Sequence, residues 1–157
     1  MNGEAVISPC GKYRYALWRR WADSPQVLFV MLNPSTANAT DDDPTIRRCI
    51  GYAKAWGYGS LAVANLFALR STDPKVIKRS AAPIGPDNDQ WIQKLASESE
   101  MAVAAWGAPG TYLKRSEEVA QLIPGFYVLG FTKAGQPLHP LFLRGDLQPY
   151  VWKGASQ

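Results

Sequence analysis

The sequence contains few of the residues that metal clusters, disulfide frameworks and membrane spans require. Its 157 residues include only two cysteines, Cys10 and Cys49, and one histidine, His139. Two distant cysteines without Cys-x-x-Cys spacing argue against a zinc cluster or a disulfide framework, and they favour a reducing compartment. No apolar run approaches the roughly 20 residues of a membrane span, and residues 1–4 do not begin an export signal. We therefore expect a cytoplasmic protein without a metal, a cofactor or a membrane partner.

The motifs of three common enzyme classes are also absent. The chain has no Walker A loop, no Gly-x-Gly-x-x-Gly fingerprint and no Gly-x-Ser-x-Gly elbow. Residues 106–110 are similar to a phosphate-cradling turn, but no Gly-Lys-Ser/Thr follows them. Nucleotide hydrolysis, dinucleotide redox chemistry and serine hydrolysis are therefore disfavoured.

The composition indicates one folded domain over residues 1–157. Hydrophobic residues make up 46% of the chain, which suffices for a single core. Repeats, low-complexity tracts and long linkers are absent. The formal charge of +4 is a weak basic excess that permits, but does not require, binding to an anionic polymer.

Apolar runs alternate with helical patterns between residues 27 and 129, which predicts an α/β fold. We expect a three-layer sandwich with a central, mainly parallel four-stranded sheet and an N-terminal edge strand over residues 13–18. The expected central strands cover residues 27–31, 61–67, 101–105 and 126–129. Asp43-Pro44 is a typical helix start, and this helix should end before Gly57. Further helices are expected after Asp87 or Asn88 and after residues 107–110.

The loops that follow parallel strands should meet at one rim of the sheet, where α/β folds bind ligands. These loops cover residues 33–43, 65–73, 106–110 and 133–143. Asn33 can hold a water or a substrate edge there, or it can only cap its own turn. Asn65 can pair with a nucleobase edge or bond its own loop, and Phe67 can stack on that base or belong to the core. His139 can stabilise an oxyanion or shuttle a proton, or it can be incidental.

Charged residues lie next to the first of these loops. Asp41, Asp42 and Asp43 are adjacent carboxylates, and one of them is most simply a helix cap. The other two are either solvated surface residues, or they supply a general base or the ligands of an Mg²⁺ ion. Arg47 and Arg48 form either an exposed helix face or a phosphate contact.

Several stretches carry a resemblance to a known family. They are Cys10-Gly11-x-Tyr13-Arg14-Tyr15, residues 31–37, residues 42–49, Trp56-Gly57-Tyr58-Gly59 and residues 65–70. The chain resembles the bacterial and phage family catalogued as domain of unknown function 1643, over residues 10 to about 143. This resemblance implies no activity.

Three motifs are also similar to the uracil-DNA glycosylase superfamily, especially its mismatch-specific branch. Leu32-Asn33-Pro34-Ser35 resembles the motif whose asparagine positions the hydrolytic water, with Ser35 in place of glycine. Residues 64–70 resemble a base-gripping strand end. His139-Pro140-Leu141 resembles the late His-Pro-Ser motif and its wedge, with Leu141 in place of serine. The order of these motifs along the chain agrees, but the acidic cluster has no counterpart.

The second resemblance implies a DNA glycosylase-like hydrolase of N-glycosidic bonds that acts on a flipped base or a nucleotide, with DNA the expected partner more than RNA. Each matching position then has an implied role. The catalytic residues are Asn33, Asp42 or Asp43, and His139; the base-binding residues are Asn65, Phe67 and Ser35; Arg47, Arg48, Arg70 and Lys133 hold phosphates; and Leu141 or Phe142 fills the gap left by the base. Two alternatives stay open: a non-catalytic nucleic-acid or nucleotide binder, and an Mg²⁺-dependent small-molecule enzyme built on Asp41 to Asp43.

Overall fold

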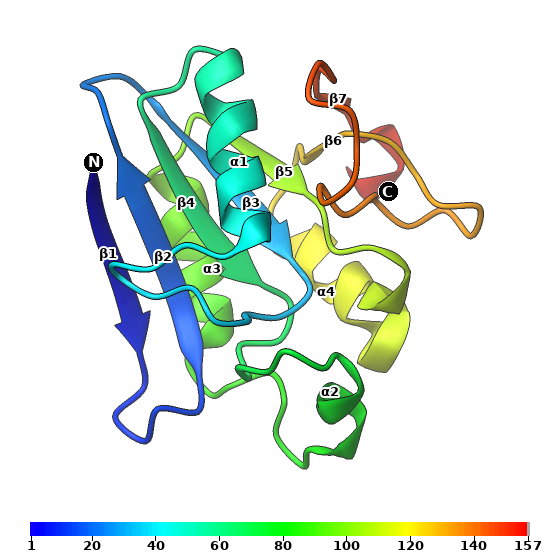
Figure 1. Cartoon of the computed structure of the whole chain (residues 1–157). Helices are drawn as coiled ribbons and strands as arrows, with labels where there is room; N and C mark the ends of the chain where they lie inside the picture. The colour runs from blue at the N-terminus through cyan, green and yellow to red at the C-terminus, as the bar shows by residue number, and fades with distance from the viewer. Residues whose placement is uncertain (157) are drawn as a thin grey trace.

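A computed structural model, which describes residues 1–156, shows an α/β fold built on one mixed β-sheet (Figure 1). In the described part of the chain the sheet has seven strands in the order β1-β2-β4-β3-β5-β6-β7. The strands are β1 (Asn2–Ile7), β2 (Arg14–Arg20), β3 (Gln26–Met31), β4 (Ser60–Asn65), β5 (Met101–Ala104), β6 (Tyr127–Val128) and β7 (Tyr150–Val151). The α/β class predicted from the sequence is confirmed.

The sheet is parallel at its centre and antiparallel at both margins. β3 pairs in parallel with β4 and β5, and β5 pairs in parallel with β6. β1, β2 and β7 add antiparallel strands. The expected edge position of residues 13–18 is wrong, because β1 pairs along the outer side of β2. The two-residue β7 is too short to show a strand period in the sequence.

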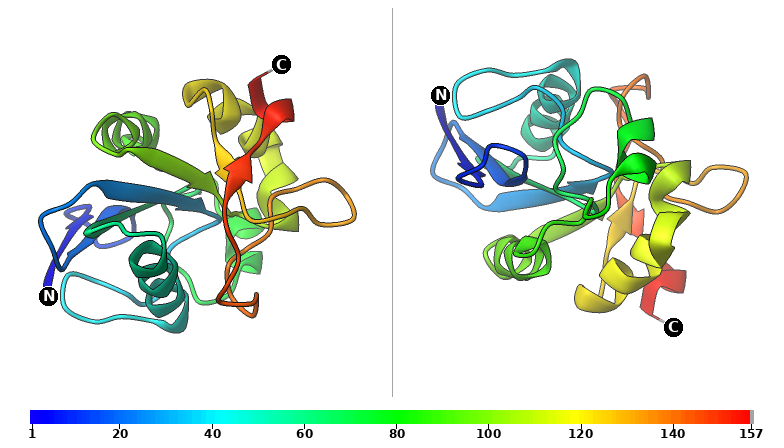
Figure 2. Two further views of the ribbon diagram at one scale, coloured as in Figure 1. Left: turned by 90° about the horizontal axis from the view of Figure 1, so that it is seen from above. Right: turned by 90° about the horizontal axis from the view of Figure 1, so that it is seen from below.

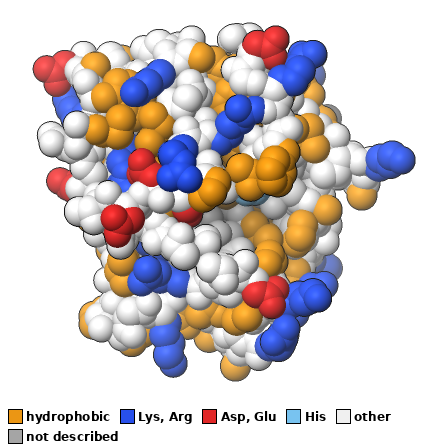
Figure 3. All heavy atoms as spheres, in the orientation of Figure 1, with side chains coloured by type: hydrophobic (Ala, Val, Ile, Leu, Met, Phe, Trp, Pro, Cys, Tyr) orange, Lys and Arg blue, Asp and Glu red, His pale blue; other side chains and the backbone are white. Residues whose placement is uncertain are grey.

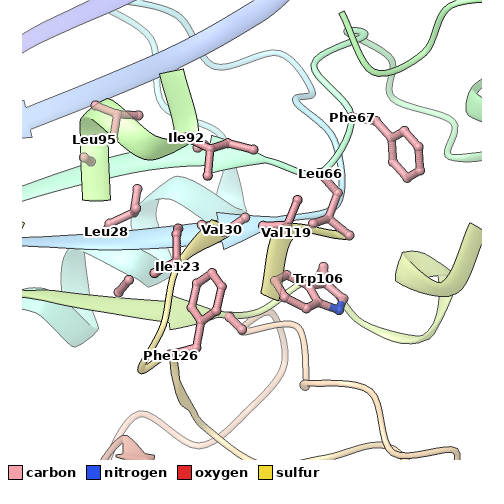
Figure 4. Packing of buried hydrophobic residues seen from close by; sticks show 14 of the residues in the cluster. Leu28, Val30, Leu66, Phe67, Ile92, Leu95, Trp106, Val119, Ile123 and Phe126 are labelled. Carbon is pink, nitrogen blue, oxygen red and sulfur yellow. The ribbon is translucent and has the colours of Figure 1, made fainter. Parts of the chain in front are cut away.

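Helices cover the two faces of the sheet (Figure 2). They are α1 (Pro44–Ala55), α2 (Lys75–Arg79), α3 (Asn88–Ser97), α4 (Arg115–Leu122) and the 3₁₀ segments η1 (Ala108–Lys114) and η2 (Lys153–Ser156). One buried cluster joins Leu28 of β3 to α3 and α4 (Figure 4), and another joins Phe29 to α1. Adjacent side chains of β3 therefore pack into the cores on opposite faces of the sheet, which explains why the whole strand is apolar.

The start of α1 follows the prediction. The Asp43 carboxylate accepts the backbone N–H of Ile46 at 2.8 Å, and Pro44 occupies the first helical position. Ala55 is the last helical residue, and Gly57 adopts the left-handed φ of 85°. The expected end before Gly57 is therefore confirmed.

The predicted start of α3 is confirmed, whereas the helix expected after residues 107–110 needs correction. α3 begins at Asn88 with Asp87 at the N-cap position, although Asp87 makes no capping hydrogen bond and the buried Asn88 side chain donates to strand-end carbonyls. The helix expected after residues 107–110 begins only at Arg115, since η1 and two left-handed residues, Leu113 and Lys114, precede it.

The loops after the parallel strands lie at one rim. The backbone N–H of Gly107 donates to Pro137 at 2.8 Å, and the N–H of Ser71 donates to Pro34 at 2.9 Å. These contacts join the loop after β5 to the late loop, residues 133–143, and the loop after β4 to the loop after β3. Within residues 1–156, no helix has the length and apolar character to cross a bilayer.

Candidate functional site

A small polar pocket lies at the carboxyl ends of β3 and β4. It encloses about 40 Å³. Its lining comes from β2, β3, the loop after β3, β4, the start of α1 and the late loop. The lining residues are Arg14, Met31, Asn33, Ser35, Asp43, Thr45, Ile46, Asn65 and His139. On the face in Figure 3, a small part of the histidine is visible between hydrophobic side chains. The structure thus brings together Asn33, Ser35, Asp43, Asn65 and His139, as the rim argument expects.

Asn33 is held by both backbone segments that border it. Its Nδ2 donates to the carbonyl oxygens of Ser71 at 3.0 Å and Pro34 at 3.2 Å. Because the amide donor is engaged, the side-chain Oδ1 is the atom left to accept from a water or a ligand. The carboxamide therefore has a fixed orientation at the pocket wall.

Asn65 ends β4 and is only 1% exposed. Its Nδ2 is fully shielded and has no hydrogen-bond partner among the described residues. A buried donor without a partner costs about 1–3 kcal/mol, so this amide is poised for a ligand or a bound water.

The strand end that carries Asn65 is fixed from behind by two buried side chains. Asn88 Nδ2 donates to the carbonyl oxygens of Asn65 at 2.8 Å and Leu66 at 3.1 Å. Arg115 Nε donates to the same Leu66 oxygen at 3.0 Å. The backbone of Asn65 cannot shift without breaking these bonds.

Asp43 is the only member of the acidic cluster in the pocket lining. It is 8% exposed. One carboxylate oxygen accepts the N–H of Ile46 at 2.8 Å, and the other accepts the N–H of Ala37 at 3.4 Å. Asp43 therefore both begins α1 and supplies negative charge to the pocket.

Arg14 is the pocket residue that the sequence reasoning missed. It lies at the start of β2, is 2% exposed, and donates from Nη1 to the carbonyl of Ala37 at 3.0 Å. Its Nε has no partner among the described residues. Burial lowers the pKa of Arg14 to about 10, although the nearby Asp43 carboxylate acts in the opposite direction. An arginine within the otherwise apolar stretch of residues 13–18 is the signal that could have identified it.

His139 lines the pocket, and one of its ring nitrogens has a defined hydrogen bond. Its Nδ1 accepts the backbone N–H of Leu141 at 3.2 Å. A neutral imidazole with Nδ1 as acceptor carries its proton on Nε2. Burial lowers the pKa of His139, and the Asp43 charge only partly opposes this. His139 is therefore a neutral Nε2–H donor at pH 7.

The three carboxylates of the acidic cluster diverge. Asp42 pairs with the buried Arg19 at 2.8 Å, and Asp41 contacts Asn38. Asp42 does not line the pocket, whereas Asp43 does, so of the two predicted catalytic carboxylates only Asp43 lies where the prediction requires it. Within the described residues, no three His, Cys, Asp or Glu side chains gather closely enough to hold a metal ion. The Mg²⁺ alternative, which needs these carboxylates together, has no geometric basis here.

Phe67 belongs to the core rather than to the pocket. It is fully buried, and its ring centroid lies 5.8 Å from that of Tyr112. The predicted stacking of a base on Phe67 is therefore not possible in this arrangement, because core packing already covers the ring.

The predicted phosphate and wedge residues lie outside the pocket lining. Arg70 donates to the carbonyl of Gly11 at 3.4 Å, Lys133 is exposed on the late loop, and Leu141 is partly buried beside His139. Arg47 and Arg48 line a separate pocket on α1.

Comparisons with known proteins connect the chain to a family but to no described activity. No curated protein and no solved structure matched it. A family model described as "Protein of unknown function (DUF1643)" matches residues 14–141, which include the whole pocket lining. The chain belongs to this family.

Proposed function

We propose that this protein recognises a nucleobase and hydrolyses the N-glycosidic bond of a nucleic acid or a nucleotide in the manner of a DNA glycosylase. One observation carries the proposal. Asn33, Asn65 and His139, from three distant parts of the chain, line one pocket in which the Asn65 amide has no protein partner. An amide offers an adjacent donor and acceptor, which complements a base edge of the same kind.

The pocket offers hydrogen-bond partners for both the base and the water. Asn65 and the Nε2–H of His139 donate to a carbonyl oxygen of the base. The Oδ1 of Asn33 orients a water, and Asp43 accepts its proton. The water oxygen bonds to the sugar C1′ while the bond from C1′ to the base nitrogen breaks. The electron pair leaves with the base, whose negative charge the two donors stabilise.

The size of the pocket sets a condition on this reaction. A cavity of about 40 Å³ has room for a few waters, each of which needs roughly 10–15 Å³, but not for a base. Entry of a base therefore requires the rim to open. The late loop is the candidate for this movement, because Phe142 is 93% exposed and has a left-handed φ of 69°. Such backbone is disfavoured for a non-glycine residue, and an exposed ring provides little packing against displacement.

The test is base release from single- and double-stranded oligonucleotides that each carry one modified or mismatched base. We expect release from at least one substrate, and a fall of about 100-fold or more with Asn33→Ala or Asn65→Ala. Asn2→Ala, which changes an exposed asparagine of β1, serves as the control and should retain full activity. No release from any substrate would overturn the hydrolase proposal.

A non-catalytic binder is the second candidate, and one observation favours it. Both oxygens of Asp43 already accept backbone N–H groups, and Asp42 is paired with Arg19. If neither carboxylate takes a proton from water, the pocket grips a base without cleaving its bond. Salt-sensitive oligonucleotide binding that depends on Asn65, without base release, would establish this alternative.

A further inference from the structure

A second pocket lies on the solvent-facing side of α1 and shares no residue with the first. It encloses about 190 Å³, and its lining residues are Arg47, Arg48, Gly51, Tyr52 and Gly145. Its two arginines occupy consecutive positions of α1, one turn after the helix start. This pocket is larger than the first and presents basic rather than mixed polar groups.

The two arginines have no acidic partner among the described residues. Neither takes part in a salt bridge, and Asp146, an acidic residue near Tyr52, is paired with Arg144 at 3.2 Å. The Nε of Arg48 is fully shielded and makes no hydrogen bond within residues 1–156. The Arg48 guanidinium therefore has donor capacity that the described residues leave unused, and its planar fork suits the oxygens of an anionic ligand.

Aromatic packing holds Arg48 in place. Its guanidinium carbon lies 5.3 Å from the centroid of the Tyr52 ring. That ring stacks on Trp56, with centroids 5.3 Å apart, and its hydroxyl donates to the carbonyl of Arg144. The planar donor fork of Arg48 is therefore oriented in advance, an arrangement that suits the oxygens of a phosphate.

Gly51 keeps the floor of this pocket open. It lies inside α1, where glycine weakens a helix, yet no packing requires its small size. A Cβ placed on Gly51 would meet no atom within 4 Å. The missing side chain leaves space directly beside the two arginines.

The same two segments line both pockets. In α1, Thr45 and Ile46 line the first pocket and Arg47 and Arg48 the second; in the segment after β6, His139 borders the first and Gly145 the second. Since a helix rises about 1.5 Å per residue, the two sites are separated by less than one turn along α1. A nucleotide unit can present its base to one pocket and a phosphate to the other.

We propose that Arg47, Arg48, Gly51 and Tyr52 form a phosphate-binding site for the backbone of the same ligand whose base enters the first pocket. The link to that base rests on the proposed function, whereas the phosphate site does not. The phosphate is either the diester of a nucleic-acid strand or the monoester of a free nucleotide. The site assigns the ligand to the nucleotides rather than to free bases or nucleosides.

The experiment measures binding of a fluorescein-labelled single-stranded DNA oligonucleotide at several salt concentrations. With Arg47→Gln/Arg48→Gln, we expect affinity at 50 mM salt to fall tenfold or more, and the slope of log K against log salt to decrease by about 1.4, or about 0.7 per lost phosphate contact. Gly51→Glu should cause a similar loss, because it places a negative charge beside the two arginines. Arg48→Lys should restore only part of the affinity, because lysine keeps the charge without the fork.

Two further measurements distinguish a phosphate monoester from a diester, and they test the phosphate site separately from the hydrolase proposal. The first compares binding of deoxyuridine monophosphate with binding of deoxyuridine. A preference for the monophosphate that disappears in Arg47→Gln/Arg48→Gln identifies a monoester site. Loss of oligonucleotide binding alone in this variant identifies a diester site. Unchanged binding of both probes in the double variant and in Gly51→Glu overturns the phosphate site, whatever the base-release assay shows. Conversely, Arg-dependent oligonucleotide binding without base release supports the phosphate site and leaves only the hydrolase proposal overturned.

Discussion

Substitutions at Asp43 separate its role as a helix cap from its electrostatic role beside the buried Arg14. Asp43→Asn retains a capping side chain, since asparagine caps as well as aspartate, but it removes the negative charge. The remaining charge on Arg14, whose pKa burial already lowers to about 10, then has no nearby counter-charge. Asp43→Ala removes both the charge and the cap.

The magnitudes follow from the geometry. Two unit charges 4 Å apart attract by about 4 kcal/mol at an effective dielectric constant of 20, and by less at longer range. No direct ion pair joins Asp43 to Arg14, because the Arg14 fork donates to the carbonyl of Ala37 instead. We therefore expect Asp43→Asn to lower the free energy of unfolding by about 2 kcal/mol. Asp43→Ala should lower it by about 3 kcal/mol, since a lost cap adds about 1 kcal/mol.

Urea unfolding at pH 7 of the wild type, the two Asp43 variants, Arg14→Met and Arg14→Met/Asp43→Asn measures these differences. In the Arg14→Met background, Asp43→Asn should cost less than about 1 kcal/mol, because the charge it opposes is absent. The reasoning is refuted if Asp43→Asn matches the wild type while Asp43→Ala alone loses stability. In that case Asp43 is a cap and nothing more.

Three other predictions concern pH, the helix and the strand end. Because burial lowers the pKa of His139 in the folded chain, protonation of His139 favours the unfolded state, and stability should fall as the pH drops from about 6.5 toward the lower folded-state pKa. His139→Gln should reduce this loss in urea midpoints between pH 5 and 7.5, and an unchanged pH profile would contradict it. Gly51→Ala should raise the free energy of unfolding by about 0.5–1 kcal/mol, because its Cβ meets no atom within 4 Å; a fall in the thermal midpoint would be the contrary result. Asn88→Ala should cost about 1–3 kcal/mol by leaving the carbonyl of Asn65 unpaired, and it should weaken oligonucleotide binding as well; an effect on stability alone would show that Asn88 does not position Asn65.

The rim of the sheet is the part of the site that the sequence pattern predicts well. The run of residues 27–31 is apolar on both faces, and the structure buries it between α1 on one side and α3 and α4 on the other. Strands buried in this way lie inside a parallel sheet, so the polar residues that follow them must share its rim. Asn33 follows β3 and Asn65 ends β4, so the pattern predicts that they lie near each other, and both line the pocket.

The acidic cluster illustrates what could not be predicted. Asp41, Asp42 and Asp43 are equivalent in the sequence, and local pattern identifies only the cap before Pro44. Their partners lie far along the chain: Asp42 pairs with Arg19 of β2, and the Asp43 charge faces Arg14 of the same strand. Because β2 reaches this position by pairing with β4, no local spacing encodes these contacts. Phe67 likewise follows a strand end, and packing against Tyr112 decides that it is core.

The sequence by itself determined the α/β alternation, the capped start of α1 at Asp43 and the asparagines that end or follow the first two parallel strands. These features depend on period, capping chemistry and turn residues, which act over a few positions of the chain. Only the tertiary structure decided that Arg14 enters the pocket, that Asp42 leaves it and that Arg48 lies on Tyr52 beside an open glycine. Those outcomes depend on which distant groups share a buried volume, and on the cost of leaving a charge or a donor there without a partner.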